Sequence, residues 1–134
     1  MRELAVGDEG PTIRVDDLSR PDFVRYAGAS GDFNPIHYDE PHATSAGNKS
    51  VFGQGMLTAG ILSNVLTEWF DIGCITRFET RFTGQVWPGD SVIATGEVVA
   101  VSEDPPSGYE LSLTAETDDG RTVITGSATV EQTD

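Results

Sequence analysis

The apolar segment 56–70 restricts the fold of this chain more than any other part of the sequence. It contains no proline, and the large apolar residues Leu57, Ile61, Val65 and Trp69 recur at the spacing of one helix face. Few polar residues interrupt the rest of its circumference, so no side of such a helix is suited to face water. The segment therefore predicts a helix that other elements enclose.

Beyond this segment the hydrophobic pattern changes to an alternation of two, the period of half-buried strands. The alternation predicts four strands joined by tight turns, over residues 75–82, 92–101, 109–116 and 124–130. Shorter upstream signals predict a strand at 12–15, a helix through 23–27 that ends at or shortly after Gly28, and a short helix at 41–46. A buried helix before a long antiparallel sheet predicts an α+β fold in which the sheet wraps around the helix.

Length and composition limit the number of domains and the compartment. A chain of 134 residues that is 37% hydrophobic can bury one core and is too short for a second, so we expect a single domain over residues 1–134. The sequence has no stretch of about 18 apolar residues. Its N-terminus is charged early, so we expect a cytoplasmic protein without a membrane partner. The one cysteine, Cys74, excludes an intrachain disulfide and a thiolate metal cluster, and we expect it to be packed.

The chain is strongly acidic, with 22 Asp and Glu residues against 8 Lys and Arg, a formal net charge of -14, and Lys49 as the only lysine. Nucleic-acid phosphates would be repelled, so we expect no nucleic acid partner. The acidic residues are dispersed in short clusters such as 16–17, 39–40 and 103–104, as in proteins of salt-loving organisms. Because the Debye length falls to about 3 Å at 1 M salt, high salt would screen their repulsion. The composition therefore predicts a halophilic protein.

Residues 30–37 have the clearest chemical meaning. They place Asp32 and His37 five positions apart in a segment whose Gly, Asn and Pro content argues against a helix. Pro35 cannot donate a backbone hydrogen bond and biases Asn34 away from helical geometry, so both side chains should be held on a stiff loop. Histidine titrates near neutral pH and aspartate is normally ionised there, which suits a pair that exchanges a proton with water or substrate. The alternative is structural, with Asp32 capping the turn and His37 packed.

Three segments together resemble the MaoC-like hydratase/dehydratase family of the hot-dog fold, and within it the short (R)-specific enoyl-thioester hydratases. They are residues 26–37, with Asp-x-Asn-Pro-x-His, residues 53–60, with Gly-Met-Leu, and residues 81–90, with Arg-Phe and Val-Trp-Pro-Gly-Asp. The two motifs at this separation are more specific than either alone. The resemblance extends over roughly residues 10–130 and implies a hot-dog fold and an enzyme of fatty acid metabolism.

The resemblance implies that Asp32 and His37 are the catalytic pair and that the Gly55 N–H polarises the thioester carbonyl. Gly55 also opens the expected helix, where unpaired N–H groups and the positive end of the helix dipole are available to a developing enolate oxygen. In the implied reaction, Asp32 and His37 deprotonate a water that attacks C3 of a trans-2-enoyl thioester. A proton is then delivered to C2 from the same side. We expect no metal ion and no cofactor.

Further residues surround this expected centre. Asn34 should tie the loop together or contact the substrate, and Ser63 matches a family position that holds the aspartate or water, or else bonds back to its own helix. Many relatives have histidine immediately before Gly-Met-Leu, whereas this chain has Gln54, which cannot titrate. We expect the acyl pocket to be lined by Phe33, Phe52, Met56, Leu57 and Leu62.

The carrier of the acyl group is inferred from charge. Coenzyme A has phosphates, for which Arg77 and Arg81, with Lys49, are the candidate ligands; pairing with Glu79 and neighbouring carboxylates is the alternative. An acyl-carrier protein is itself acidic and would be repelled by this chain. The expected substrates are therefore enoyl-CoA and 3-hydroxyacyl-CoA.

The resemblance also implies a homodimer, because a second copy lines the acyl tunnel in this family, and an exposed strand edge favours joining two sheets. A heterodimer with a related subunit stays open. Two other functions stay open as well. A hot-dog thioesterase is disfavoured because Asp32 and His37 precede the central helix, and a non-catalytic acyl-thioester-binding subunit is disfavoured by the presence of Asp32, His37 and Gly55.

Overall fold

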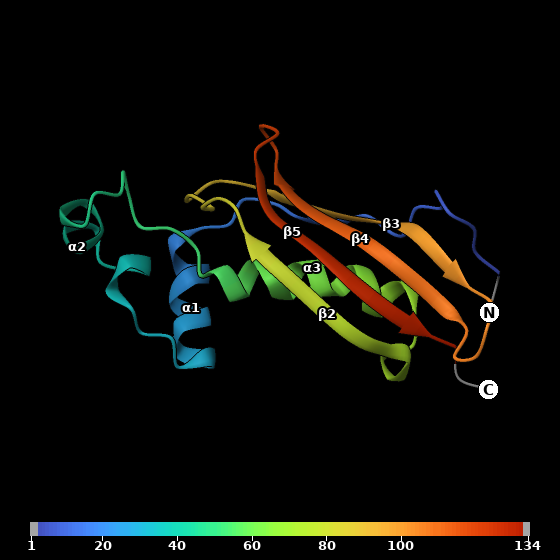
Figure 1. The fold of residues 1–134 in the computed structure, drawn as a ribbon. Coiled ribbons are helices and arrows are strands. Elements are labelled where there is room, and N and C mark those ends of the chain that lie inside the picture. Colours follow the sequence, from blue (N-terminus) through green and yellow to red (C-terminus); the bar gives the residue numbers. More distant parts are fainter. Residues whose placement is uncertain (1–2, 133–134) are drawn as a thin grey trace.

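A five-stranded antiparallel sheet curves around one central helix (Figure 1), which confirms the predicted α+β fold. The computed structural model describes residues 3–132. In chain order the elements are β1 (Ile13–Val15), α1 (Arg20–Ser30), η1 (Pro35–His37), α2 (Glu40–Ser45), α3 (Gly55–Trp69), η2 (Ile72–Cys74), β2 (Ile75–Phe82), β3 (Val92–Ser102), β4 (Gly108–Thr117) and β5 (Thr122–Glu131). The element types expected from the hydrophobic periods are confirmed, and most boundaries shift by only one or two residues.

The strand order is β1-β3-β4-β5-β2, so β2 and β3 are not neighbours although they follow one another in the chain. β2 pairs with β5, for example Phe78 with Ala128, and forms one edge of the sheet. The expectation that a tight turn joins the strands at 75–82 and 92–101 was therefore wrong. A turn does form at residues 87–90, where the Asp90 N–H donates to the Trp87 carbonyl at 3.0 Å. That turn, with Gly89 at a φ of 93°, lies inside a longer connection, residues 83–91, which crosses from β2 to β3.

The core lies between one face of α3 and the concave face of the sheet. Leu62, Val65 and Leu66 are fully buried there, and a buried leucine contributes about 2 kcal/mol through removal of apolar surface from water. Close approach of the helix requires Gly96 on β3, since a Cβ at that position would lie 2.9 Å from Leu113 and 3.1 Å from Val65. The opposite face of α3, including Asn64 and Glu68, is exposed. Within the single chain, other elements therefore cover one face of α3 and leave the opposite face exposed, so the expectation that no side of this helix faces water was wrong.

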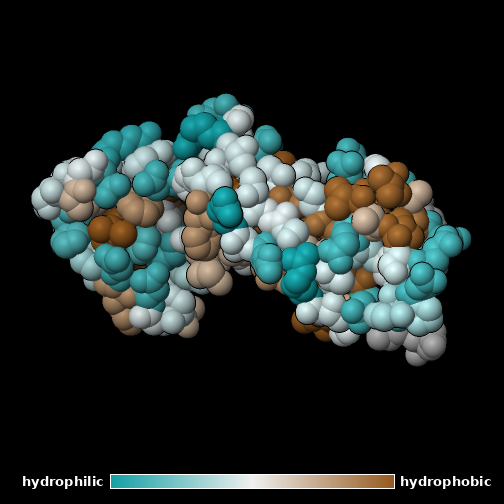
Figure 2. Space-filling model, in the orientation of Figure 1, coloured by the Kyte–Doolittle hydropathy of each residue, from teal (hydrophilic) through white to brown (hydrophobic). Residues whose placement is uncertain are grey.

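Helices α1 and α2 with η1 form a lobe that extends beyond one end of the sheet, next to the N-terminus of α3 (Figure 1). The start of α1 is fixed by Ser19, whose backbone N–H and hydroxyl both donate to Asp22 Oδ2 at 2.9 Å. Its end lies at Gly31, which adopts the left-handed conformation with a φ of 78°. Figure 2 shows the surface drawn inwards between this lobe and the rest of the molecule.

Two expectations from composition bear on the described part of the chain. Cys74 is buried, as expected. Within residues 3–132, no helix has both the length and the apolar character needed to cross a membrane.

Candidate active site

The loop between α1 and α2 is held by its own polar groups. The Asp32 N–H donates to Ser30 Oγ (3.1 Å), the Asn34 N–H donates to Asp32 Oδ1 (3.3 Å), and the Ile36 N–H donates to Asn34 Oδ1 (3.2 Å). Asn34 thereby caps η1, a single 3₁₀ turn that the Gly, Asn and Pro content led us not to expect. The asparagine ties the loop together, and the turn brings His37 back towards Asp32.

His37 is buried and Asp32 is exposed, with side chains that are 8% and 44% accessible. The His37 Nδ1 lies 2.7 Å from the carbonyl oxygen of Phe52. Because a carbonyl only accepts hydrogen bonds, Nδ1 must carry the proton, and Nε2 of the neutral ring is then an acceptor. Nε2 lies 3.7 Å from Asp32 Oδ2. The structure therefore brings together the two titratable side chains singled out in the sequence.

A separation of 3.7 Å between Nε2 and Oδ2 is too long for a direct hydrogen bond. Both atoms are acceptors when the ring is neutral and the carboxylate is ionised. One water molecule can donate one O–H to each of them, which orients its oxygen lone pair away from both. This arrangement suits activation of a water as a nucleophile.

A row of aromatic rings backs the His37 imidazole. Its centroid lies 5.1 Å from that of Phe52 in an edge-to-face contact, and Phe52 lies 5.9 Å from Trp87 in the same type of contact. Lys49 Nζ lies 4.4 Å from the Trp87 ring centroid. The contacts join three segments that are separate in the sequence: the 30–38 loop, the 47–54 loop and the 83–91 connection.

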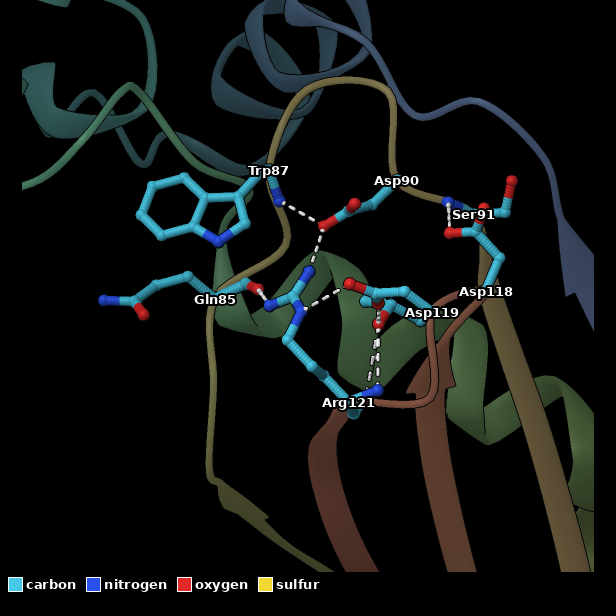
Figure 3. A network of polar contacts seen from close by, with 8 residues as sticks. Gln85, Trp87, Asp90, Ser91, Asp118, Asp119 and Arg121 are labelled. Atoms are coloured by element: carbon cyan, nitrogen blue, oxygen red, sulfur yellow. Dashed lines mark hydrogen bonds and ion pairs between the residues drawn. The ribbon is translucent and has the colours of Figure 1, made fainter.

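The 83–91 connection is fixed by Arg121, the residue just before β5 (Figure 3). Its guanidinium donates to Asp90 Oδ2 (2.7 Å), to the Gln85 carbonyl oxygen (3.1 Å) and to Asp119 Oδ2 (3.2 Å). Asp90 Oδ2 also accepts the Trp87 N–H at 2.8 Å. Sequence reasoning missed this network, because Arg121 and Asp90 are 31 residues apart and only the strand order brings them together.

Asp119 is also held in its charged form. A hydrogen bond from the Thr117 hydroxyl, followed by that from Arg121, holds the pKa of the Asp119 carboxyl below its usual range. The turn between β4 and β5 therefore presents an ionised carboxylate to Arg121 at neutral pH.

Gly55 is the first residue of α3, where backbone N–H groups have no partner within the helix. Phe82 of β2 covers it, since a Cβ at Gly55 would lie 3.0 Å from the Phe82 ring. A cavity of about 370 Å³ opens here, lined by Phe52, Gly53, Gly55, Phe82, Thr83, Gly84 and Gln85. Asp32 and His37 do not line it. Phe52 connects the two places, because it is one of the lining residues and its carbonyl accepts the hydrogen bond from His37.

The other residues expected to contact the substrate are dispersed. Phe33 and Met56 are exposed, Leu57 is partly buried against the core, and Leu62 is fully buried within it. The Ser63 hydroxyl donates to the Gly60 carbonyl of its own helix at 2.6 Å, which is the alternative that the sequence left open.

Arg77 and Arg81 both lie on β2 but differ in their partners. Arg77 forms ion pairs with Glu110 (3.0 Å) and Glu79 (3.1 Å). Arg81 is exposed, and none of the carboxylates in residues 3–132 lies within ion-pair distance of it. For Arg77, the structure therefore has the alternative to phosphate binding, which is pairing with Glu79 and a neighbouring carboxylate.

Gln54 forms a buried connection that the sequence did not predict. Its side chain is fully buried, and Nε2 donates to the Phe23 carbonyl in α1 at 2.8 Å. Its Oε1 has no hydrogen-bond partner among the described residues. Gln54 therefore joins α1 directly to the start of α3, next to Gly55.

Comparison with known proteins places this chain in a family. A family model described as "MaoC like domain" matches residues 6–111. The (R)-specific enoyl-CoA hydratase of Rhodospirillum rubrum is 36% identical over 115 residues, which are 84% of this chain and 78% of that protein. The mitochondrial 3-hydroxyacyl-[acyl-carrier-protein] dehydratase of Arabidopsis thaliana is 29% identical over 100 residues, which are 75% of this chain but only 59% of the plant protein.

The fold has the same relatives. The solved structure of the (R)-hydratase from A. caviae involved in PHA biosynthesis superposes with a TM-score of 0.84 and 27% sequence identity, covering 99% of this chain and 100% of that one. Sequence and fold agree, and the chain belongs to the MaoC-like hydratase/dehydratase family, with its hot-dog fold.

Proposed function

We propose that this protein catalyses the addition of water to trans-2-enoyl thioesters to give (3R)-hydroxyacyl thioesters, and the reverse dehydration. The observation that carries the proposal is the pair of acceptor atoms, His37 Nε2 and Asp32 Oδ2, held 3.7 Å apart by a rigid turn. The (3R) configuration is the one that the name of the Rhodospirillum rubrum relative specifies.

The mechanism follows from the polar groups of the site. A water that donates to both His37 and Asp32 loses a proton to the pair as its oxygen attacks C3. Negative charge develops on the thioester oxygen, where the Gly55 N–H at the positive end of α3 stabilises it. The pair then returns a proton to C2, so that H and OH add across the double bond. Dehydration is the same sequence in reverse.

The second part of the proposal is a homodimer that completes the acyl site. β2 is an eight-residue edge strand, and its Phe78 and Phe82 lie on the side that faces α3 yet stay exposed. Met56 of α3 is exposed as well, and Figure 2 shows apolar patches on the surface of the single chain. A second copy paired along β2 would cover these side chains and satisfy the strand edge.

Incubation of the purified protein with crotonyl-CoA tests the reaction. Loss of enoyl absorbance without release of free thiol is the expected result, with (3R)-hydroxybutyryl-CoA as the product. Release of free thiol would identify a thioesterase instead. No change in either signal, with crotonyl-CoA still bound, would identify a non-catalytic binding subunit.

A further inference from the structure

We propose that Lys49, held over the Trp87 ring, binds a phosphate group of the carrier to which the acyl chain is attached. This inference rests on the proposed function, because it assigns the far end of the same thioester substrate. The proposed mechanism names only residues that act on the acyl chain and its thioester carbonyl. Lys49 would add a residue that recognises the carrier.

The first argument is the pairing of positive charges. Among the described residues, Arg14, Arg20, Arg25, Arg77 and Arg121 each lie within ion-pair distance of a carboxylate. Lys49 has no such partner in residues 3–132. Arg81 on β2 is the other exposed positive side chain of this part of the chain that lacks a carboxylate partner. In a chain with a net charge of -14, the unpaired Lys49 ammonium is available to an external anion.

Nearby charges do not neutralise Lys49. Glu40 is bound to the residue that follows Lys49 in the chain, since the Ser50 hydroxyl donates to it at 3.4 Å. Glu40 is itself paired with Arg20 at 2.6 Å, and the hydrogen bond from Arg20 is the main cause that lowers the pKa of the Glu40 carboxyl. The Glu40 carboxylate is therefore already compensated by Arg20.

The second argument is that the ammonium is positioned. Lys49 Nζ lies 4.4 Å from the Trp87 ring centroid, a cation–π distance. The backbone of Trp87 is itself anchored, because its main-chain N–H donates to Asp90 and Asp90 is held by Arg121 (Figure 3). One side of the ammonium is covered by the ring. No hydrogen bond joins its N–H groups to residues 3–132, so they can donate to phosphate oxygens, with the ammonium acting as a point charge.

The third argument is location. The ring contacts run from Lys49 to Trp87, Phe52 and His37 in steps of 4.4, 5.9 and 5.1 Å between neighbours. Phe52 and Gln85 line the cavity at Gly55, and Figure 3 shows the Trp87 and Gln85 side chains extending from the same side of their loop. A pantetheine arm that leaves the thioester site past Phe52 would bring its phosphate to the Lys49 side of the rim.

Both coenzyme A and a phosphopantetheinyl carrier protein have such a phosphate. The test therefore compares kcat/KM on three crotonyl thioesters: coenzyme A, phosphopantetheine, and pantetheine without phosphate. For Lys49→Gln we expect the preference for crotonyl-CoA over crotonyl-pantetheine to fall roughly twofold to fivefold, the size of an exposed ion pair. Lys49→Arg retains the charge and should retain the preference. Arg14→Gln removes an exposed, paired charge elsewhere and should leave the preference unchanged.

The phosphopantetheine thioester identifies the phosphate. In Lys49→Gln, the preference over crotonyl-pantetheine can fall equally for crotonyl-phosphopantetheine and for crotonyl-CoA, and Lys49 then binds the phosphate that both carriers share. If the preference falls for crotonyl-CoA alone, Lys49 binds a phosphate of the nucleotide. An unchanged preference in Lys49→Gln, or an equal loss on all three thioesters, would overturn the inference.

Equilibrium binding separates this inference from the proposed function. Calorimetric titration with coenzyme A should show weaker binding by Lys49→Gln than by the wild type. If the wild type does not hydrate crotonyl-CoA but this difference in binding is found, the proposed function fails and the Lys49 site stands. Equal binding by both proteins, or no binding by the wild type, would reject the Lys49 site even if hydration is observed.

Discussion

A single hydrogen bond determines which nitrogen of His37 faces Asp32. The Phe52 carbonyl accepts the Nδ1 proton at 2.7 Å, and Nε2 is thereby turned towards the carboxylate. Burial of the imidazole between the loop and Phe52 fixes the plane of the ring as well. The two side chains are consequently aligned by the fold itself, which in the proposed reaction would reduce the entropy cost of aligning the reacting groups.

Gln54 offers a sharp test at the residue scale. Gln54→Glu would place a carboxylate in a fully buried position beside the Phe23 carbonyl, an acceptor that cannot compensate its charge. We expect a loss of about 3–5 kcal/mol in the free energy of unfolding at pH 7. A protonated carboxyl can donate to Phe23 as the amide does, so the loss should shrink as the pH falls. Urea unfolding at several pH values measures this.

The matched control is Gln85→Glu, the same substitution at an exposed position. It should change the free energy of unfolding by no more than about 0.5 kcal/mol. Equal effects of the two substitutions would show that Gln54 is not buried in the folded protein.

The sequence predicted the pairing of Asp32 with His37 because both lie on one short loop, where local turn chemistry decides geometry. It could not predict the partners that come from elsewhere in the chain. The Phe52 carbonyl and the Phe23 carbonyl are backbone groups, and every residue has one, so only the folded structure identifies them.

At the scale of elements, the 83–91 connection links the site to the sheet. It contributes Trp87 to the aromatic row, and its Val86 carbonyl accepts the Gly53 N–H at 2.8 Å, just before α3 begins. Arg121 fixes this connection to the turn between β4 and β5 (Figure 3). One side chain in this turn therefore stabilises the loop that lines part of the cavity.

Arg121→Gln should destabilise the protein by about 1–3 kcal/mol at neutral pH, because Asp90, whose side chain is only 19% accessible, loses its charged partner. The pKa of Asp119 is lowered in the folded state, so its contribution is complete above the ordinary aspartate value of about 3.9 and is lost as the pH falls through the lowered value. The difference between wild type and variant should therefore shrink below about pH 4. Thermal melts at several pH values measure it.

Arg14→Gln serves as the control at this scale, because the Arg14 pair with Asp16 is exposed on both sides. Its effect should stay within about 0.5 kcal/mol at any pH. A similar, pH-independent loss in both variants would mean that the Arg121 network does not hold the connection.

The periods of the sequence predicted the elements well because burial of one face imposes its own repeat, 3.6 for α3 and two for β2 to β5. They did not predict that β2 pairs with β5 across the crossover. Alternation specifies which face of a strand is buried. Which strands pair with one another depends instead on how the whole sheet curves around the helix.

At the scale of the whole molecule, the acidic surface sets the response to salt. With a net charge of -14 and few positive groups, repulsion opposes the compact state at low ionic strength. We expect the melting temperature to rise as KCl is increased from low to molar concentration, because screening shortens the range of this repulsion. A melting temperature that falls steadily over the same series would argue against adaptation to salt.

The proposed dimer can be tested on β2. Phe78 is 37% accessible in the single chain, and Phe78→Glu would place a charge on the surface that a second copy should cover. We expect this variant to elute as a monomer in size-exclusion chromatography with light scattering, under conditions in which the wild type is a dimer.

Val99→Glu is the matched control, since Val99 is 49% accessible but lies on β3, away from the β2 edge. It should leave the dimer intact, and circular dichroism should show both variants folded. A wild-type monomer, or a dimer that survives Phe78→Glu, would contradict pairing through β2.

The most direct test of the proposed mechanism is the initial rate of crotonyl-CoA hydration by the wild type, Asp32→Asn and His37→Ala, with His42→Ala as the control for loss of an exposed histidine outside the site. Each substitution in the pair should lower the rate about 10²-fold to 10⁴-fold, the range for a positioned acid or base, while the protein stays folded. His42→Ala should retain the wild-type rate. Full activity in either Asp32→Asn or His37→Ala would contradict the account.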